Sequence, residues 1–490
     1  MNTDHMSIYP FKTPPYAHQY AVWNKSKDEA YHGLFMEMGT GKTKVIIDNA
    51  AYLYDQGKID GLIIIAPKGT YRVWYDYEIE KHMPDHIDWA MHLWQSSRTA
   101  TQSYLREVNQ FLNSTKMRLK ILIVNVEGMV NATSKSTKLV TNFMKKRSNV
   151  MMVVDESTCI KNPNAKRTKI VTKLGKEARY RRIMTGMAIP NGPLDVYSQA
   201  NFLSPGALGY TSYMSFKAEY SISEDRHIGY NRVIKAVVGY RNTDQLKAKL
   251  QNFCSLVKKD DCLDLPSKVY VYREMSMSPE QQKWYDEMKR DSIILLNEID
   301  TVSAKIALTQ LVKLHQITCG FTIDDDGNLL EIPTTLWDEV LDWASEIQGK
   351  AIIWSPYRYG VRKIRDTLVE KFGPNSLALY YGETKANDRV ESVSRFQEDP
   401  ECRFFIGTPQ TGGFGLTLTA ASHELYISNS FNLEHRLQSE DRAHRIGQTK
   451  SVVITDIVIP DTISSRILAA LKAKKTMGDM VLNWQELLDV

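Results

Sequence analysis

A short glycine-containing stretch, MGTGKT, carries the clearest chemistry in the sequence. It lies directly after the apolar run GLFME and before a stretch with helical spacing, which is the setting that a phosphate-binding loop requires. There, Lys42 can reach the β- and γ-phosphates of a nucleotide and Thr43 can hold magnesium. The alternative is a glycine turn that only opens a helix, since Met36 replaces the first glycine of the full pattern. The predicted nucleotide-binding residues of this loop are Met38, Gly39, Thr40, Gly41, Lys42 and Thr43.

An acidic pair, Asp155 and Glu156, ends the apolar run VMMVVDE. A magnesium-nucleotide site needs a carboxylate at the end of a nearby strand. We therefore predict that Asp155 holds the metal and that Glu156 polarises the attacking water. Taken alone, an apolar strand ending in Asp-Glu is more often only a strand terminus. The pair gains its significance from following MGTGKT in the same predicted sheet.

A basic pair, Arg442 and Arg445, lies in the stretch QSEDRAHRIGQ. Phosphoryl transfer needs positive charge on the transferred group in the transition state. The three-residue spacing predicts that both guanidinium groups lie on one face of a helix. The alternative is a solvated charged helix, which would be the better interpretation without the other two motifs.

Short apolar runs bounded by turn residues must position these motifs. Such runs span residues 33–37, 61–67, 120–126 and 150–156, and others begin at Lys350, Ser376, Arg403, His423 and Val452. They are typical of strands buried on both faces, and stretches with helical spacing separate them. The sequence therefore predicts an α/β fold with two parallel sheets, each covered by helices, and with helical insertions.

The length of 490 residues exceeds what a single hydrophobic core usually organises, so two domains are expected. We place an N-terminal ATP-binding domain at residues 1–262, with an insertion near 193–260, where the strand-helix alternation is lost. A C-terminal domain then spans residues 263–490. It should contain a helical region near 279–345 and a C-terminal helix.

The composition excludes several classes of protein. No apolar run reaches the roughly 20 residues that a membrane span needs, and the N-terminus lacks the pattern of a secretion signal. We therefore expect a cytoplasmic protein without a membrane partner. The five cysteines form no CxxC pair, which argues against a disulfide framework and a structural zinc site. A net charge of +5 is compatible with a polyanionic partner but does not establish one.

Together the motifs resemble those of the Swi/Snf branch of the superfamily-two helicase-like translocases, over nearly the whole chain and in the same order. The matching stretches are PYAHQ (15–19), IIAPKGTYRVW (64–74), DESTCIKN (155–162), TGMAIPNGPLD (185–195), AIIWSPYR (351–358), GTPQTGGFGLTLTAAS (407–422) and QSEDRAHRIGQ (438–448). The last stretch, motif VI of that family, is the one that best distinguishes the family from others. The resemblance implies two RecA-like lobes with the ATP site in the cleft between them, and ATP and Mg²⁺ as cofactors.

The resemblance also implies roles for individual residues. Gln19 would read the adenine edge, and Gly413 and Gly415 would close the second lobe on the nucleotide. Arg442 and Arg445 would act across the cleft as arginine fingers. The residues implied to couple hydrolysis to lobe movement are Thr185, Gly186 and Gln438, and the candidate contacts to nucleic acid are Lys68, Trp74 and Thr417.

The sequence departs from the family pattern in three motifs. Ser157 and Thr158 follow the Asp-Glu pair where Gly-His or Ala-His is usual, and Met187 and Ala188 stand where Thr and Pro are common. Thr417 stands where Asn is usual. These changes bear on coupling rather than on hydrolysis. Because the large insertions and reader domains of chromatin remodellers are absent from the sequence, we expect a compact phage or bacterial member. We also expect a monomer.

These expectations combine into an ATP-dependent translocase on double-stranded DNA, used in remodelling, repair or recombination. One alternative is a strand-separating helicase on DNA or RNA, for which no wedge hairpin is evident from the sequence. Another is an ATP-gated clamp on DNA or protein that barely hydrolyses ATP; stimulation of turnover by DNA would separate a motor from a clamp. The basic run at residues 161–182 fits either phosphate contacts or a solvated helix.

Overall fold

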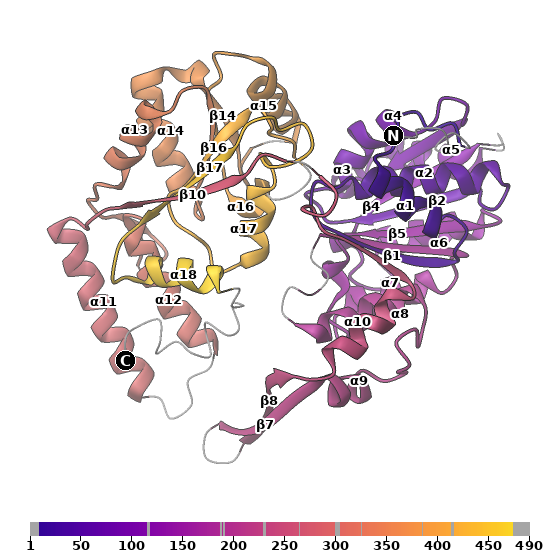
Figure 1. The fold of residues 1–490 in the computed structure, drawn as a ribbon, viewed down its shortest axis with the longest axis horizontal. Coiled ribbons are helices and arrows are strands. Elements are labelled where there is room, and N and C mark those ends of the chain that lie inside the picture. Colours follow the sequence, from indigo (N-terminus) through magenta and orange to yellow (C-terminus); the bar gives the residue numbers. More distant parts are fainter. Residues whose placement is uncertain are drawn as a thin grey trace. The chain divides into compact units, whose positions relative to one another are not determined.

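The computed structural model describes residues 9–114, 118–186, 189, 192–228, 232–263, 265–298, 304–324, 326–384, 386–412 and 416–473. The chain forms two compact units. Unit 1 comprises Met1–Asp225 and Lys235–Asp264, and unit 2 comprises Arg226–Ile234 and Leu265–Val490. Each unit is built around its own parallel sheet (Figure 1).

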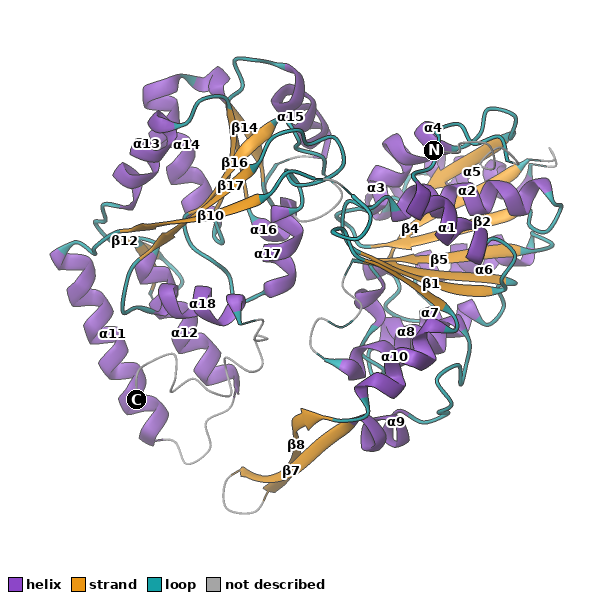
Figure 2. Ribbon diagram, in the orientation of Figure 1, coloured by secondary structure: helices purple, strands orange, loops and turns teal. Residues whose placement is uncertain are grey.

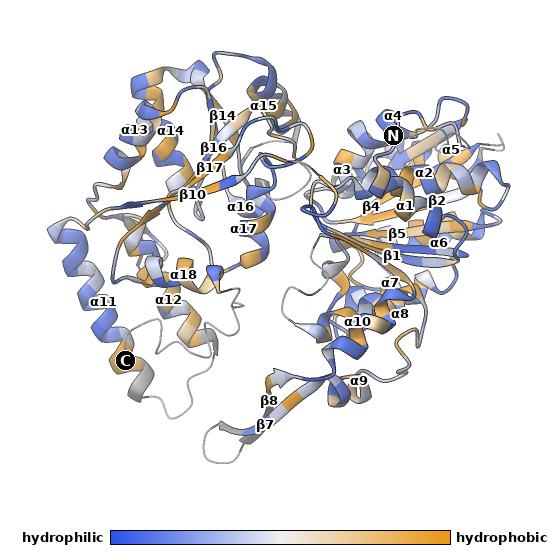
Figure 3. Ribbon diagram, in the orientation of Figure 1, coloured by the Kyte–Doolittle hydropathy of each residue, from blue (hydrophilic) through white to orange (hydrophobic). Residues whose placement is uncertain are grey.

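The sheet of unit 1 has the strand order β3-β4-β2-β5-β6-β1-β9, with every neighbouring pair parallel. The strands are β1 (Tyr31–Met36), β2 (Gly61–Ala66), β3 (Trp89–Leu93), β4 (Leu119–Asn125), β5 (Val150–Asp155), β6 (Tyr180–Thr185) and β9 (Cys254–Val257). The four apolar runs of the first half correspond to β1, β2, β4 and β5, which are predominantly hydrophobic in Figure 3. The edge strands β3 and β9 are only partly buried, so their apolar patterns are weaker.

Helices cover both faces of this sheet. One hydrophobic core lies under α1 (Ala17–Ser26), α2 (Lys42–Asp55) and the helical segment from Tyr71 to His82. The other lies under α5 (Gln102–Asn113), α6 (Lys135–Lys145), α7 (Lys166–Gly175) and α8 (Val196–Leu203). This is the two-faced burial that the continuous apolar runs predict.

The region near 193–260 contains α8, α9 (Tyr213–Tyr220), α10 (Thr243–Gln251) and the sheet strand β9. It also contains β7 (Ser221–Ile228) and β8 (Arg232–Tyr240), which form a two-stranded sheet (Figure 2). The sequence does not reveal this hairpin because the first strand, SISEDRHI, mixes charged with apolar residues and shows no apolar run.

The sheet of unit 2 has the strand order β10-β17-β16-β13-β15-β14 and is also parallel throughout. The strands are β10 (Lys268–Glu274), β13 (Lys350–Trp354), β14 (Leu377–Tyr380), β15 (Phe404–Gly407), β16 (Ala421–Tyr426) and β17 (Val452–Val458). The five apolar runs of the second half correspond to β13 through β17. Strand β10 is exposed at the sheet edge. Its sequence, KVYVYRE, alternates in character and was not among the predicted apolar runs.

Three groups of helices complete unit 2. One core lies under α13 (Leu336–Glu346) and α14 (Arg358–Phe372), and a second lies under α15 (Ala386–Glu398). A third cluster joins α11 (Pro279–Glu298), α12 (Ala304–Thr318) and α18 (Ile463–Lys472). In the described part of unit 2, the remaining elements are β11 (Phe321–Ile323), β12 (Leu329–Glu331), the 3-10 helix η6 (Pro374–Ser376), α16 (Pro409–Gly412) and α17 (Leu433–Glu440). Among the described residues, no helix combines the length and apolar character that a bilayer crossing requires.

Candidate functional site

The loop between β1 and α2 contains two glycines in the left-handed region and leads into a buried lysine. Gly39 and Gly41 have φ angles of 80° and 87°, in the left-handed region that favours glycine. The Lys42 side chain is buried, and its Nζ donates to the carbonyl oxygens of Met36 at 2.8 Å and Glu37 at 3.2 Å. The ammonium group of Lys42, the first residue of α2, therefore folds back to the end of β1.

Gln19, near the start of α1, is bonded to this loop. Its Nε2 donates to the Thr40 carbonyl at 3.0 Å, and its Oε1 accepts from the Tyr16 N–H at 3.1 Å. His18 Nε2 lies 2.8 Å from the same Thr40 carbonyl, a contact that the sequence analysis did not identify. A Cβ atom at Gly41 would lie 2.2 Å from Gln19 Nε2, so this close approach requires glycine. The helix α1 and the loop are thus held together at one carbonyl oxygen.

Asp155 ends β5, and its side chain is 6% exposed. Its Oδ1 accepts from the Glu156 N–H at 2.8 Å, and its Oδ2 accepts from the Trp74 indole N–H at 2.9 Å. Burial and the charge of Glu156 raise the pKa of Asp155 to about 7, although the Trp74 hydrogen bond and the charge of Lys42 act in the opposite direction. A bound cation would favour the ionised carboxylate, and a carboxylate such as that of Asp155 and a hydroxyl such as that of Thr43 are the kinds of oxygen ligand that suit Mg²⁺.

Glu156 has a φ angle of 43°, an uncommon left-handed conformation for a residue with a side chain. Such strained conformations concentrate at functional sites. Its Oε2 accepts a hydrogen bond of 3.0 Å from the Thr185 hydroxyl at the end of β6. The next residue, Gly186, lies so close to Met38 that a Cβ atom would be 2.6 Å from Met38 Cγ. The predicted coupling residues Thr185 and Gly186 therefore connect Glu156 with the phosphate-binding loop.

Ser157, one of the departures from the family pattern, is fully buried. Its hydroxyl donates to Gln199 Oε1 on α8 at 2.5 Å, and Gln199 Nε2 donates to the Asp195 carbonyl at 2.9 Å. The serine thus anchors the acidic loop to α8. Among the other departures, Thr158 is buried and Thr417 is exposed, whereas Met187 and Ala188 lie outside the described residues.

The burial of Trp74 contradicts the prediction that this residue contacts nucleic acid. Its side chain is only 2% exposed and lies in the core shared with α1 and α2, with its indole N–H bonded to Asp155. A buried indole ring offers no face on which a base can stack. We therefore assign Trp74 to positioning Asp155. The other two candidates, Lys68 and Thr417, are exposed, and the Lys68 backbone N–H donates to the Glu127 carboxylate at 3.0 Å.

Arg442 and Arg445 do not share a helical face, so this prediction is wrong. Helix α17 ends at Glu440, and residues 441–448 follow in turns. The two guanidinium groups nevertheless converge, because Nη1 of Arg442 at 3.2 Å and Nη1 of Arg445 at 2.7 Å both donate to the Leu416 carbonyl. The shared acceptor, rather than helical spacing, brings them together.

Gln448 organises these turns and was not among the predicted residues. Its Oε1 accepts from the backbone N–H groups of the next two residues, both at 3.0 Å. Its Nε2 donates to the carbonyl oxygens of Thr419, Ala421 and Ala443. One glutamine side chain therefore ties the motif VI turns to the segment that leads into β16.

Gln438, a predicted coupling residue, is buried on α17 and is directly linked to Arg442. Its Nε2 donates to Glu434 Oε1 at 3.1 Å, while its carbonyl accepts from Arg442 Nε at 2.8 Å. Gly413 and Gly415, which are predicted to close on the nucleotide, lie outside the described residues.

Family comparisons agree with these motifs. Residues 16–321 match the SNF2-related domain, and residues 333–447 match the helicase conserved C-terminal domain. The chain belongs to the SNF2 family. The resemblance of the seven motifs is thereby confirmed, and the two helix-covered parallel sheets are the RecA-like lobes of an SNF2 core.

Curated relatives in the SNF2 family have low sequence identity to this chain but align with most of its length. An uncharacterized ATP-dependent helicase of Mycoplasma genitalium is 25% identical over 92% of this chain and 40% of its own length. A DNA annealing helicase and endonuclease of Mus musculus is 25% identical over 91% of this chain and 38% of its own length. The chain thus spans about 40% of the length of these relatives. Among solved structures, the Sulfolobus solfataricus SWI2/SNF2 ATPase core in complex with dsDNA covers 98% of this chain and 96% of that chain, with 22% identity and a TM-score of 0.42.

Proposed function

We propose that this SNF2 chain is an ATP-dependent translocase on double-stranded DNA. The observation that carries the proposal is the edge of the unit 1 sheet at which β1, β5 and β6 end. There, Lys42 follows β1, Asp155 and Glu156 lie at the end of β5, and Thr185 ends β6. A phosphate-binding lysine, a metal carboxylate and a second carboxylate for water are the parts that MgATP hydrolysis needs.

In the proposed reaction, Lys42 exchanges its two carbonyl partners for the β- and γ-phosphates of ATP. Thr43 and Asp155 would hold Mg²⁺, which neutralises charge on the phosphate oxygens when bound. Glu156 accepts a hydrogen bond from the attacking water and takes up its proton as the water oxygen bonds to the γ-phosphorus. The bond from that phosphorus to the bridging oxygen breaks, and ADP leaves. Thr185, bonded to the Glu156 carboxylate, sets the direction in which that carboxylate points.

For unit 2 we propose that Arg442 and Arg445 leave the Leu416 carbonyl and donate to the γ-phosphate bound at unit 1. Both guanidinium groups already converge on one oxygen, so their donors are arranged for a single anionic group. Gly413, Gly415 and Gln438 would complete this half of the site. Repeated formation and loss of these contacts would drive stepping.

DNA is proposed as the track on two grounds. The basic run contains an exposed set of cations against the single exposed acid Glu177, namely Lys166, Arg167, Lys169, Lys173, Lys176 and Arg179. Arg182 is fully buried and does not belong to this set. The mouse relative, by its description, anneals DNA. Backbone contacts imply weak sequence preference and strong salt sensitivity. A monomer in the cytoplasm of a bacterium or a phage-infected cell, serving remodelling, repair or recombination, completes the proposal.

The test is the steady-state ATPase rate of the chain alone and with single-stranded DNA, duplex DNA, forked DNA or RNA. We expect duplex DNA to raise kcat severalfold and the Glu156→Gln variant to lose this activity. Duplex stimulation would then be followed by triplex displacement, which reports movement along a duplex. A rate indifferent to every nucleic acid would contradict a motor and favour a clamp, whereas separation of the forked strands would favour a helicase.

Replacing Trp74 by Phe tests the positioning of Asp155. A hydrogen bond to a charged group contributes about 1.5–3 kcal/mol, so the Mg²⁺ concentration for half-maximal ATPase activity should rise about 10-fold or more. The affinity for duplex DNA, measured by fluorescence anisotropy, should not change. Trp94→Phe is the matched control because Trp94 is also a buried tryptophan of unit 1. Weaker DNA binding with an unaltered Mg²⁺ requirement would instead support the original prediction that Trp74 contacts nucleic acid.

A further inference from the structure

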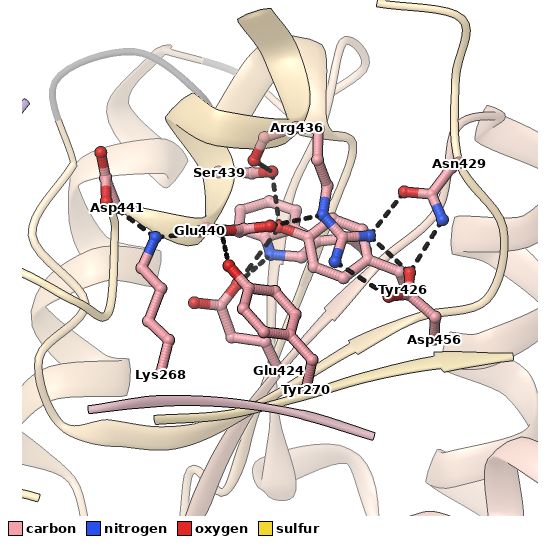
Figure 4. Close-up of polar contacts among 11 residues, drawn as sticks. Lys268, Tyr270, Glu424, Tyr426, Asn429, Arg436, Ser439, Glu440, Asp441 and Asp456 are labelled. Atoms are coloured by element: carbon pink, nitrogen blue, oxygen red, sulfur yellow. Dashed lines mark hydrogen bonds and ion pairs between the residues drawn. The ribbon is translucent and has the colours of Figure 1, made fainter. Parts of the chain in front are cut away.

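The segment at which the chain begins unit 2 is bonded directly to motif VI. Lys268 Nζ donates to Glu440 Oε2 at 2.9 Å and to Asp441 Oδ1 at 3.2 Å (Figure 4). Two residues earlier, the Pro266 carbonyl lies 2.7 Å from His444 Nε2. The contacts flank Arg442 on both sides in the sequence.

Glu440 is the centre of a buried polar network that holds α17 on the sheet. Besides Lys268, it accepts hydrogen bonds from Arg436 Nε at 2.7 Å and from the Tyr270 hydroxyl at 3.0 Å. Arg436 also forms a two-pronged ion pair with Asp456 on β17, in which Nη2 and Oδ2 are 3.0 Å apart. The helix is therefore attached to β10 and β17 by charged groups, as Figure 4 shows.

Burial and neighbouring charges shift the pKa values of two groups in this network. Burial lowers the pKa of Lys268, but the carboxylates of Asp441 and Glu440 outweigh burial and raise it above its ordinary value, so the ammonium group stays charged. Burial raises the pKa of the nearby Glu424 to about 8, so this carboxyl group is mainly neutral at pH 7. Lys268 therefore forms its ion pairs with the carboxylates of Glu440 and Asp441.

Buried ion pairs are weak sources of stability compared with apolar packing, but they can fix one geometry. Here the geometry is that of the end of α17. Glu440 is its last residue, Asp441 follows, and Arg442 is the next residue along the chain. A displacement at Glu440 or Asp441 would pass directly to the Arg442 backbone and to its bond with the Leu416 carbonyl.

We propose that Lys268 is a positioning residue for the two arginines of motif VI. By holding Glu440 and Asp441, it sets the point from which the turns at 441–448 start, and hence the direction of Arg442 and Arg445. The inference rests on the proposed function, because it assumes that these arginines act on the γ-phosphate of ATP.

The test measures kcat and KM for ATP at saturating duplex DNA in Lys268→Met and Lys268→Arg. Misplacement of a catalytic group by a fraction of an ångström to 1 Å is costly, so Lys268→Met should lower kcat about 10-fold or more. The KM for ATP should change less than about 2-fold, because the proposed ATP-binding residues of unit 1 are intact. Lys268→Arg, which keeps the charge, should restore at least half of the wild-type kcat. A matched control is Lys363→Met, which removes a partly exposed lysine paired with Glu331 in the same unit.

Each result bears on a defined claim. A folded Lys268→Met chain with wild-type kcat, or an equal loss in Lys268→Arg, overturns the positioning role. If Lys268→Met does not fold, as judged by circular dichroism, Asp441→Ala removes one acceptor of Lys268 and leaves the bond to Glu440. A severalfold loss of kcat in Asp441→Ala supports the inference, and no loss overturns it. A wild-type chain that DNA does not stimulate overturns the proposed function and the inference together, whereas a stimulated wild type beside an unaffected Lys268→Met overturns the inference alone.

Discussion

A Glu156→Gln chain is expected to bind ATP normally and to hydrolyse it about 10² to 10⁴ times more slowly, the range over which a general base contributes. The amide has nearly the shape of the carboxylate but cannot take up a proton from water. Its oxygen can still accept the hydrogen bond from Thr185. The loop geometry should therefore survive and the loss should fall on the chemical step. The measurement is steady-state ATPase with duplex DNA, beside binding of a fluorescent ATP analogue.

The control for this prediction is Glu177→Gln, which removes an exposed acid of unit 1 at the end of the basic run. It should leave kcat unchanged. If Glu156→Gln retained more than about a tenth of wild-type turnover, Glu156 would not be the proton acceptor, since a base contributes about 10²-fold or more. A parallel loss of ATP binding would instead place Glu156 in ground-state binding.

The sequence predicts those parts of the site that are contiguous in the chain. The loop residues Gly39 to Thr43 depend on one strand, one turn and one helix, and Asp155 depends on one buried strand. Strong local patterns therefore suffice to place them at the carboxyl edge of a parallel sheet. Membership of the SNF2 family follows from the order of seven such local motifs.

Residues that depend on tertiary contacts could not be predicted in this way. Trp74 and Asp155 are 81 residues apart, and only the packing of Trp74 in the core of unit 1 brings the indole N–H to the carboxylate. Ser157 reaches Gln199 across 42 residues. In each pair the partner has no local signal, because a buried polar side chain resembles any other polar residue in the sequence.

The motif VI arginines show a different kind of failure. A three-residue spacing fits a helix face, but the helix ends at Glu440 because residues 441–448 make other hydrogen bonds. Gln448 satisfies five backbone groups there. Helical spacing predicts proximity only while the helix continues. The convergence of Arg442 and Arg445 was therefore expected for the wrong reason.

The second large effect is expected from Arg445→Ala, which should lower kcat at saturating duplex DNA about 10³-fold or more, as for the loss of an arginine finger. Arg445 is less buried than Arg442, and one of its nitrogens is bonded to the Leu416 carbonyl. Lysine should not substitute, because it offers a point charge rather than a planar set of donors. ATP affinity of the variant should stay within severalfold of wild type. Arg290→Ala, an exposed arginine on α11, serves as the control.

The shared acceptor makes this prediction sharper. If Arg442 and Arg445 act on one phosphoryl group as a unit, the double Ala variant should lose scarcely more activity than the worse single variant, since residues that act together are not additive. Two independent structural roles would instead give a double variant whose fold-loss in turnover is the product of the two single fold-losses, which means that the free-energy costs add. Single-turnover ATPase rates of the four chains give this comparison directly. If the free-energy costs of the two substitutions add, or if a single variant keeps wild-type turnover, the convergence on the Leu416 carbonyl stabilises the loop and has no part in catalysis.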